Sequence, residues 1–292
     1  MIKGCSSIIG RIEMRVLVTG AAGYMGKNVV RELISRGHIV SAIDFKHDNI
    51  DERAEIIDVD IFSGNTSIFE AVGKPDLCIH LAWRDGFVHN ASSHIEDLSK
   101  HFVFLKNMME GGCARIAVMG SMHEVGYWEG CIDENTPCNP LSQYGIAKNA
   151  LRQSLMLLNQ KKNNKLYWLR AYYILGDDKR NNSIFAKLLR AAEEGKKEFP
   201  FTTGEKKYDF IDVQELAHQI VAASTQDEIT GIINVCSGKA ISLKDKVEEF
   251  IAENHLDIRL IYGAFPERPY DSNIVYGDAT KIQTILQNDI GK

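Results

Sequence analysis

The stretch Arg15–Gly26, RVLVTGAAGYMG, decides how the first part of the chain folds. Its opening residues, Arg15–Thr19, form a short apolar run typical of a buried strand, and a helical pattern follows the glycines. Gly20 permits a tight turn, Gly23 lets the backbone approach a phosphate closely, and Gly26 lets the helix pack against the strand. A glycine turn between a strand and a helix therefore predicts a site for the pyrophosphate of a dinucleotide.

The next apolar run supports this interpretation. Ile39–Asp44 is predicted to be the second strand, and Asp44 ends it 24 residues after Gly20. A carboxylate at that place accepts hydrogen bonds from ribose hydroxyls and repels a 2′-phosphate, which favours NAD over NADP. Lys27 and Lys46 lie nearby in the sequence and are more typical of solvated lysines. They leave NADP open as an alternative cofactor.

Apolar runs continue to alternate with helical patterns through the first half of the chain. This rhythm predicts βαβ units and an α/β fold, namely a Rossmann-type doubly wound parallel sheet. After Gly176 the rhythm changes, and we expect a smaller mixed α/β substrate lobe.

The predicted division is an N-terminal extension over 1–13, an NAD(P)-binding Rossmann domain over 14–173, and a mainly substrate-binding lobe over 174–292. Residues 209–236 of that lobe are expected to return to the Rossmann domain. The predicted strands and helices include Glu55–Val59, Leu77–Leu81, Arg115–Gly120, Asn139–Lys161, Leu166–Tyr172, Ser183–Gly195, Ile232–Cys236 and Leu243–Asn254.

Composition excludes several other classes of protein. The chain has 292 residues, of which 45% are hydrophobic and 25% are charged, as in an ordinary soluble domain. Its 34 Lys and Arg against 39 Asp and Glu give a net charge of −5, which argues against nucleic-acid binding. No apolar run approaches the roughly 20 residues that span a bilayer. The six cysteines lack metal-ligand spacing, so we predict no metal site, and reduced thiols in a cytoplasmic protein.

A tyrosine, a lysine and a serine form the candidate catalytic group. Tyr144 and Lys148 stand four residues apart on a predicted helix, so their side chains share one helix face. A neighbouring ammonium stabilises a phenolate, and we expect the pKa of Tyr144 to fall towards the working pH. Ser121 ends a predicted strand, where its hydroxyl can hold the same substrate oxygen. Each residue alone is commonplace, but all three fall at the carboxyl edge of the predicted sheet, where ligands bind.

With these motifs the chain resembles the extended short-chain dehydrogenase/reductases, a family of nucleotide-sugar epimerases, dehydratases and reductases. It is closest in character to the dTDP-4-keto-6-deoxysugar 4-reductases. The resemblance covers nearly everything from Met14 to Ile285. It is carried by TGAAGYMG at Thr19–Gly26, Asp44, Asp60-Ile61, HLA at His80–Ala82, GSMHEVG at Gly120–Gly126, YGIAK at Tyr144–Lys148 and DFIDVQELA at Asp209–Ala217.

The resemblance implies roles for individual residues. It implies that Asp60 and Ile61 contact adenine, that Leu81 and Ala82 line the cofactor, and that the chain forms a homodimer. The implied catalytic residues are Ser121, Tyr144 and Lys148, with Lys148 also holding the nicotinamide ribose. The whole implied cofactor set is Gly20, Gly23, Tyr24, Met25, Gly26, Asp44, Asp60, Ile61, Leu81, Ala82, Tyr144 and Lys148.

The chain departs from the family pattern around the substrate. Met122 and His123 replace the acidic pair with which the family's dehydratases eliminate water, so a dehydratase is not expected. Tyr208 stands where an arginine usually grips the substrate diphosphate. Trp83 is expected to stack on the sugar or shield the nicotinamide, with packing under a loop as the alternative. The residues predicted to bind substrate are Trp83, Met122, His123, Tyr173 and Arg268.

The sequence thus predicts an oxidoreductase that moves a hydride between NAD(P)H and C4 of a nucleotide-linked 4-keto-6-deoxyhexose. A nucleotide-sugar 4-epimerase with tightly bound NAD uses the same residues and is the first alternative. A non-catalytic dinucleotide-sensing protein is the second alternative, although such proteins typically lose the tyrosine or the lysine. A reductase of small carbonyl compounds is the third.

Overall fold

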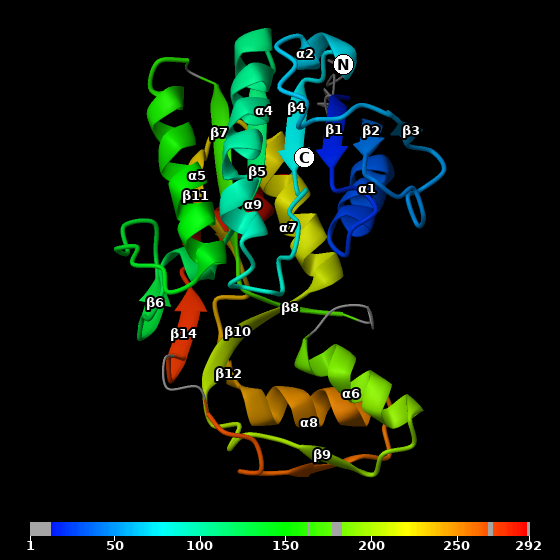
Figure 1. The fold of residues 1–292 in the computed structure, drawn as a ribbon, viewed down its shortest axis with the longest axis vertical. Coiled ribbons are helices and arrows are strands. Elements are labelled where there is room, and N and C mark those ends of the chain that lie inside the picture. Colours follow the sequence, from blue (N-terminus) through cyan, green and yellow to red (C-terminus); the bar gives the residue numbers. More distant parts are fainter. Residues whose placement is uncertain (1–12, 163, 177–182, 268–270, 291–292) are drawn as a thin grey trace, which may run out of the picture.

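The computed structural model describes residues 13–162, 164–176, 183–267 and 271–290 (Figure 1). Its centre is a parallel sheet of seven strands in the order β11-β7-β5-β4-β1-β2-β3. The order runs outward in both directions from β1, as in a doubly wound fold. The predicted fold class is therefore confirmed. The strands are β1 (Arg15–Thr19), β2 (Ile39–Ile43), β3 (Glu55–Ile56), β4 (Leu77–His80), β5 (Arg115–Ser121), β7 (Lys165–Ala171) and β11 (Gly231–Val235).

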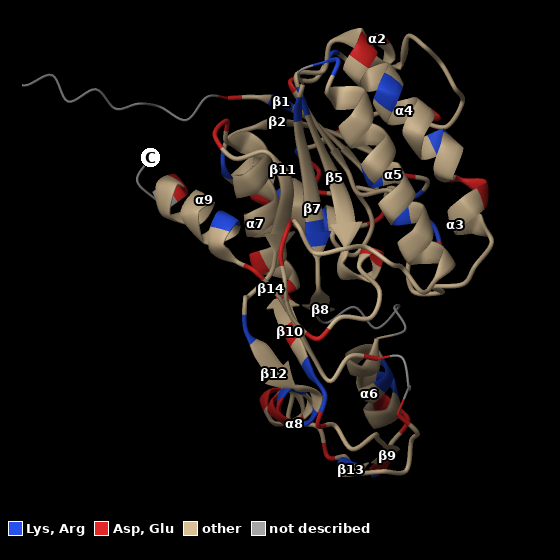
Figure 2. Ribbon diagram, turned by 90° about the vertical axis from the view of Figure 1, so that its left-hand side faces the viewer, with Lys and Arg blue, Asp and Glu red and all other residues tan. Residues whose placement is uncertain are grey.

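Helices cover both faces of this sheet, which is seen edge-on in Figure 2. On one face α7 contacts both α1 and α9, and on the other α4 contacts both α2 and α5. Acidic and basic residues are scattered over both layers of helices (Figure 2). The bounds are α1 (Gly26–Ser35), α2 (Ile68–Ala71), α3 (Ser93–Glu96), α4 (Leu98–Gly111), α5 (Gln143–Asn159), α7 (Val213–Thr225) and α9 (Thr280–Ile290).

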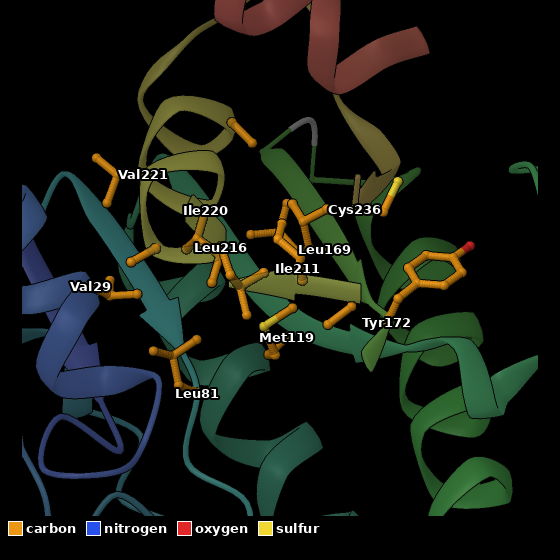
Figure 3. Close-up of a cluster of buried hydrophobic side chains, with 14 of the residues drawn as sticks. Val29, Leu81, Met119, Leu169, Tyr172, Ile211, Leu216, Ile220, Val221 and Cys236 are labelled. Carbon is orange, nitrogen blue, oxygen red and sulfur yellow. The ribbon is translucent and has the colours of Figure 1, made fainter. Parts of the chain in front are cut away.

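The central strands are apolar on both sides because helices bury both faces of the sheet. In β1, Val16 and Val18 point into one hydrophobic cluster, and Leu17 points into the cluster on the opposite face. Each is almost wholly buried, and a buried aliphatic side chain contributes roughly 1.5–3 kcal/mol. Figure 3 shows the first cluster, where α1 and α7 meet the sheet through Val29, Leu216, Ile220, Val221, Leu169 and Met119.

A second group of elements lies beyond the carboxyl ends of the central strands (Figure 1). Its main sheet has the order β12-β10-β14-β6, and β8 also pairs with β10. β9 and β13 form a separate pair. The bounds are β6 (Gly130–Ile132), β8 (Tyr173–Leu175), α6 (Ile184–Glu193), β9 (Glu198–Pro200), β10 (Lys207–Asp212), β12 (Ala240–Ser242), α8 (Leu243–Glu253), β13 (Arg259–Ile261) and β14 (Ile274–Gly277), with a 3₁₀ turn η1 (Met122–Glu124).

The two groups of elements are interlaced along the chain. β6 comes from the first half of the sequence and pairs with β14 near the C-terminus. Buried residues of α6 and α8 belong to the same hydrophobic cluster as Val16 of β1. α7, β11 and α9 all belong to the central sheet and its helices, although they follow residue 174. The division into a Rossmann domain over 14–173 and a substrate lobe stays our proposal.

Some predicted element bounds were too long. The expected strand Glu55–Val59 pairs with β2 only over Glu55–Ile56, at the edge of the sheet. The helix predicted from Asn139 begins at Gln143, because Ser142 is extended and its Oγ caps the helix by accepting the Gly145 N–H at 3.1 Å. Most of the predicted extension, residues 1–12, lies outside the described residues, as does Arg268. Among the helices that the structure describes, none is long and apolar enough to cross a membrane.

Candidate active site

Two glycines of the turn between β1 and α1, Gly20 and Gly26, leave no room for a side chain. Gly20 has φ +73°, and a Cβ there would lie 2.7 Å from the Ala82 backbone nitrogen. A Cβ on Gly26 would lie 2.0 Å from the Gly20 carbonyl oxygen, and one on Gly23 would approach that oxygen to 3.0 Å. Met25, the N-cap of α1, gives the helix no side-chain cap, so the positive end of its dipole is available to an anion. This cradle fits a pyrophosphate.

Asp44 lies directly beside this cradle, just past β2. Its Oδ2 accepts the Ala22 N–H at 2.9 Å, so the carboxylate is fixed against the glycine turn. The side chain is only half-buried, which leaves the carboxylate accessible. Tyr24 reaches across from the turn to the end of β8, where a Cβ on Gly176 would lie 2.1 Å from the Tyr24 hydroxyl oxygen. A carboxylate here is suited to the hydroxyls of a ribose.

The other residues expected to contact the cofactor occupy neighbouring strand ends. Leu81 is buried and donates its N–H to the Thr19 carbonyl at 3.1 Å, and the Ala82 N–H reaches Thr19 Oγ at 3.4 Å. Asp60 is exposed and accepts the Phe62 N–H at 2.8 Å, whereas Ile61 is buried in the hydrophobic core. Contact of Asp60 and Ile61 with adenine stays a prediction.

The structure brings Ser121, Tyr144 and Lys148 together. Ser121 ends β5, and Tyr144 and Lys148 lie one turn apart at the start of α5. The Ser121 side chain lies close enough to the Tyr144 phenol to lower its pKa. Lys148 is buried, and its Nζ donates to the Met119 carbonyl oxygen at 2.8 Å. These three groups can hold one substrate oxygen and move its proton.

The electrostatics of this group differ from the sequence-based expectation. Burial raises the pKa of Tyr144 to about 12, although the Ser121 side chain lowers it. Burial likewise lowers the pKa of Lys148 to about 7. The prediction that the pKa of Tyr144 falls was therefore wrong for the protein without a bound ligand. The reason is that the ammonium lies 5.8 Å from the Tyr144 ring centroid and both groups are desolvated. A cationic ligand group beside the phenol would lower its pKa again.

Trp83 forms a wall of the site. Lys148 Nζ lies 3.6 Å from the centroid of its indole, and His101 stacks on the ring at 4.4 Å between centroids. Its Nε1–H donates to His94 Nδ1 at 3.1 Å, and His94 Nε2 donates in turn to the Val88 carbonyl at 3.0 Å. Trp83 is thus held by packing and by one hydrogen bond, and its ring is nearly perpendicular to that of Tyr144.

Three histidines surround the Tyr144 ring, and only His123 was predicted from the sequence to lie in the site. His89 stacks on the ring with centroids 5.5 Å apart, and its carbonyl accepts the Tyr144 N–H at 2.9 Å. His94 and His123 approach the ring edge-on at 5.3 and 6.1 Å. No local motif marks His89 or His94, which lie on the segment between β4 and α4.

The remaining candidates for substrate binding have different surroundings. Met122 is buried in the hydrophobic core, and the His123 N–H donates to Ser121 Oγ at 3.3 Å. The ring of Tyr173, on β8, packs against Tyr208 with centroids 4.4 Å apart. Substrate contact by Met122, His123 and Tyr173 stays a prediction, and Arg268 lies outside the described residues.

The fold and this site define a dinucleotide-dependent enzyme of the Rossmann type. The sequence matches the model of the NAD dependent epimerase/dehydratase family over residues 16–236. The chain therefore belongs to that family. This confirms the predicted family resemblance. The description of the family as NAD dependent agrees with the predicted oxidoreductase and with NAD as its cofactor.

Two curated relatives match most of the chain. It is 46% identical over 271 residues to a dTDP-6-deoxy-L-talose 4-dehydrogenase (NAD(+)) of Aggregatibacter actinomycetemcomitans, an alignment that covers 90% of this chain and 99% of the relative. It is 25% identical over 252 residues to a dTDP-4-dehydro-6-deoxyglucose reductase of Escherichia coli, with 80% and 79% of the two chains covered.

Solved structures share the fold at lower sequence identity. A UDP-N-acetylglucosamine 4-epimerase from Methanobrevibacter ruminantium, in complex with UDP-N-acetylmuramic acid, superposes with a TM-score of 0.80 at 23% identity, covering 94% of this chain and 92% of that one. The Bordetella bronchiseptica enzyme WbmG, in complex with NAD and UDP, gives 0.77 at 20% identity, with 94% and 89% covered.

Proposed function

We propose that this protein catalyses the NAD-dependent interconversion of a hydroxyl and a ketone at C4 of a dTDP-linked 6-deoxyhexose. The observation that carries the proposal is the convergence of Ser121, Tyr144 and Lys148 at the same carboxyl edge of the sheet as the glycine turn. The identity of 46% to a dTDP-6-deoxy-L-talose 4-dehydrogenase, over nearly the full length of both chains, supports the choice of substrate.

The residues of the cradle hold the pyrophosphate and the adenosine half of the cofactor. The glycine turn and the N-terminus of α1 bind the pyrophosphate, and Asp44 binds the adenosine ribose. NAD, when bound, supplies the nicotinamide that accepts the hydride from C4 or returns it. Lys148 is suited to donate hydrogen bonds to the hydroxyls of the nicotinamide ribose. Its Nζ is already held in place by its hydrogen bond to the Met119 carbonyl oxygen.

Tyr144 and Ser121 handle the proton of the C4 hydroxyl. As a phenolate, Tyr144 takes this proton during oxidation, and as a phenol it returns the proton during reduction. Ser121 donates a hydrogen bond to the same oxygen. The His123 N–H occupies one lone pair of Ser121 Oγ, and the hydroxyl hydrogen stays available for the reacting oxygen. The rings of His89, His94 and Trp83 pack around the phenol and shield it in part from water.

Elimination of water from the sugar is not part of this proposal. The residues after Ser121 are Met122, which is buried, and His123. The next carboxylate, Glu124, is also buried, and its oxygens face the Ser121 N–H and the Trp168 indole. A dehydratase needs an acid and a base that reach the sugar, and Glu124 is directed away from it.

The test is turnover with defined nucleotide sugars. The purified protein is incubated with dTDP-6-deoxy-L-talose and NAD, and separately with a dTDP-4-keto-6-deoxyhexose and NADH, while NADH absorbance and the sugar products are followed. Net conversion of NAD to NADH, or the reverse, with a matching change at C4 supports the proposal. Isomerised sugar without net cofactor change overturns it in favour of an epimerase. Turnover only of small carbonyl compounds without a nucleotide overturns it as well.

The Tyr144→Phe variant separates an enzyme from a sensing protein. Phe keeps the ring that packs on His89 and removes the hydroxyl, so an enzyme retains NAD and loses turnover. A protein that only senses the dinucleotide keeps its output.

We further propose a cytoplasmic homodimer, as the family resemblance implies, and light scattering after gel filtration measures its mass.

A further inference from the structure

A buried carboxylate lies beside the catalytic group. Glu124 has no exposed surface. Its Oε1 accepts the Ser121 N–H at 2.7 Å and the Trp168 Nε1–H at 2.8 Å, and its Oε2 lies 3.0 Å from the same indole nitrogen. A carboxylate is rarely fully buried unless its oxygens are paired, and here both are.

Two arginines face the same carboxylate from two other elements. Arg152 of α5 places its Nε 3.4 Å from Glu124 Oε2, and Arg170 of β7 places a terminal nitrogen 3.7 Å from it. Arg170 is itself fully buried and donates to the Asp133 carbonyl oxygen at 3.0 Å. Burial raises the pKa of Glu124, and the positive charge of Arg170 opposes that rise.

The backbone before Ser121 makes room for this contact. A Cβ on Gly120 would lie 2.2 Å from Trp168 Nε1 and 2.7 Å from Glu124 Oε1. Ser121 and Glu124 cap each other across η1, since Ser121 Oγ accepts the His123 N–H while Glu124 accepts the Ser121 N–H. The cap fixes both the backbone of Ser121 and the lone pair that its hydroxyl uses. The hydroxyl hydrogen of Ser121 is therefore not used by the cap and is available to the reacting oxygen.

The charge of Glu124 also reaches the two titrating groups of the site. Its negative charge raises the pKa of Lys148, which burial lowers. It also raises the pKa of Tyr144, which burial raises as well. The other ionisable groups packed around Glu124 are Arg152 and Arg170, whose positive charges act in the opposite sense.

From this geometry we propose that Glu124 is a positioning residue of the active site, which aims the Ser121 hydroxyl at the reacting oxygen and provides the buried negative charge next to Lys148. The inference rests on the proposed function and adds to it a residue that does not touch the substrate. It predicts that the carboxylate form matters, and not only the volume of the side chain.

The test compares Glu124→Gln with Glu129→Gln. The glutamine at 124 keeps an oxygen for the Ser121 N–H but removes the charge, whereas Glu129 is an exposed residue of the same segment. We expect Glu124→Gln to lower kcat about 10–100-fold with little change in KM or NAD affinity. We also expect the pH at which oxidation reaches half its maximum to fall by about one unit, because losing a negative charge lowers the tyrosine pKa. Glu129→Gln should match the wild type in kcat and pH profile, because the hydrogen bonds of Glu129 are to Tyr127, Asn273 and Ile274 and not to the catalytic group.

A second readout does not depend on turnover. Nuclear magnetic resonance of lysine side chains, with Lys148→Met to assign the signal, measures the titration of Lys148 near pH 7. Glu124→Gln should move this titration to lower pH. If Glu124→Gln does not fold, Trp168→Phe removes one donor to the carboxylate and should lower kcat by a smaller factor.

The outcomes separate this inference from the proposed function. Failure of the wild type to turn over any dTDP-sugar overturns the proposed function, and the lysine titration still tests the charge of Glu124. An unchanged pH profile and unchanged lysine titration in Glu124→Gln would show that Glu124 is merely structural and would overturn the inference. A rise in KM at constant kcat would overturn it too.

Discussion

Replacing the buried lysine should make the protein more stable while it abolishes activity. Lys148 is only 3% exposed, and burial lowers its pKa from 10.5 to about 7. A lowered pKa means that the folded protein resists the charged form, so an ammonium at this position opposes folding. Lys148→Met keeps an unbranched side chain of similar length and removes the charge.

The magnitude follows from the pKa. At 1.36 kcal/mol per unit, the fall from 10.5 to about 7 corresponds to about 5 kcal/mol of destabilisation at pH 6, where the lysine is charged in both states. At pH 9 the folded protein holds a neutral amine, and the cost falls to about 2 kcal/mol. Methionine leaves the Met119 carbonyl without its donor, which costs about 1–3 kcal/mol.

Lys148→Met should therefore be about 3 kcal/mol more stable than the wild type at pH 6 and about equal to it at pH 9. The direction follows from the lowered pKa of Lys148 in the folded state. The wild type loses no stability to this lysine above pH 10.5, and the loss grows as the pH falls until it is complete below about 7. At pH 6 this difference raises Tm by roughly 5–10 °C.

Calorimetry of both proteins, free of NAD, at pH 6 and pH 9 measures these differences. Lys161→Met is the matched control, because Lys161 is exposed just beyond α5. The control should lie within about 0.5 kcal/mol of the wild type at both pH values. A Lys148→Met variant that is less stable than the wild type at pH 6, or a difference that does not change with pH, would refute the argument from burial.

Two further predictions concern the cofactor cradle. Gly26→Ala places a Cβ 2.0 Å from the Gly20 carbonyl oxygen, so we expect at least 10-fold weaker NAD binding and about 1–3 kcal/mol lower stability. Gly86→Ala, where a Cβ meets open space, should leave both quantities unchanged, and equal NAD affinity in the two variants would contradict the prediction. Asp44→Ala should weaken NAD binding about 10-fold and narrow the ratio of NAD to NADP affinity, measured by fluorescence titration. Asp48→Ala, at an exposed position of the same segment, is the control, and an unchanged affinity ratio in Asp44→Ala would count against a role for Asp44.

Much of the fold follows from local sequence patterns. β1 has the bounds expected of it, and β2, β4, β5 and β7 begin or end within a residue or two of the predicted runs. Strands that are buried on both faces must be continuous apolar segments, and such segments are visible without any knowledge of their neighbours. The short extent of β3 was not visible in the sequence, because β3 lies at the edge of the sheet and its length is set by its pairing with β2 alone. The true start of α5 at Gln143 depends on the cap by Ser142.

The candidate site divides in the same way. The sequence by itself determined the glycine turn, Asp44 and the spacing of Tyr144 and Lys148, because these depend on residue type and on short distances along one segment. Only the tertiary structure decided that His89, His94 and Trp83 pack around the phenol and that Glu124 holds Ser121. It also reversed the expected direction of the Tyr144 pKa. Desolvation and contacts between distant segments set these properties, and neither leaves a periodic mark in the sequence.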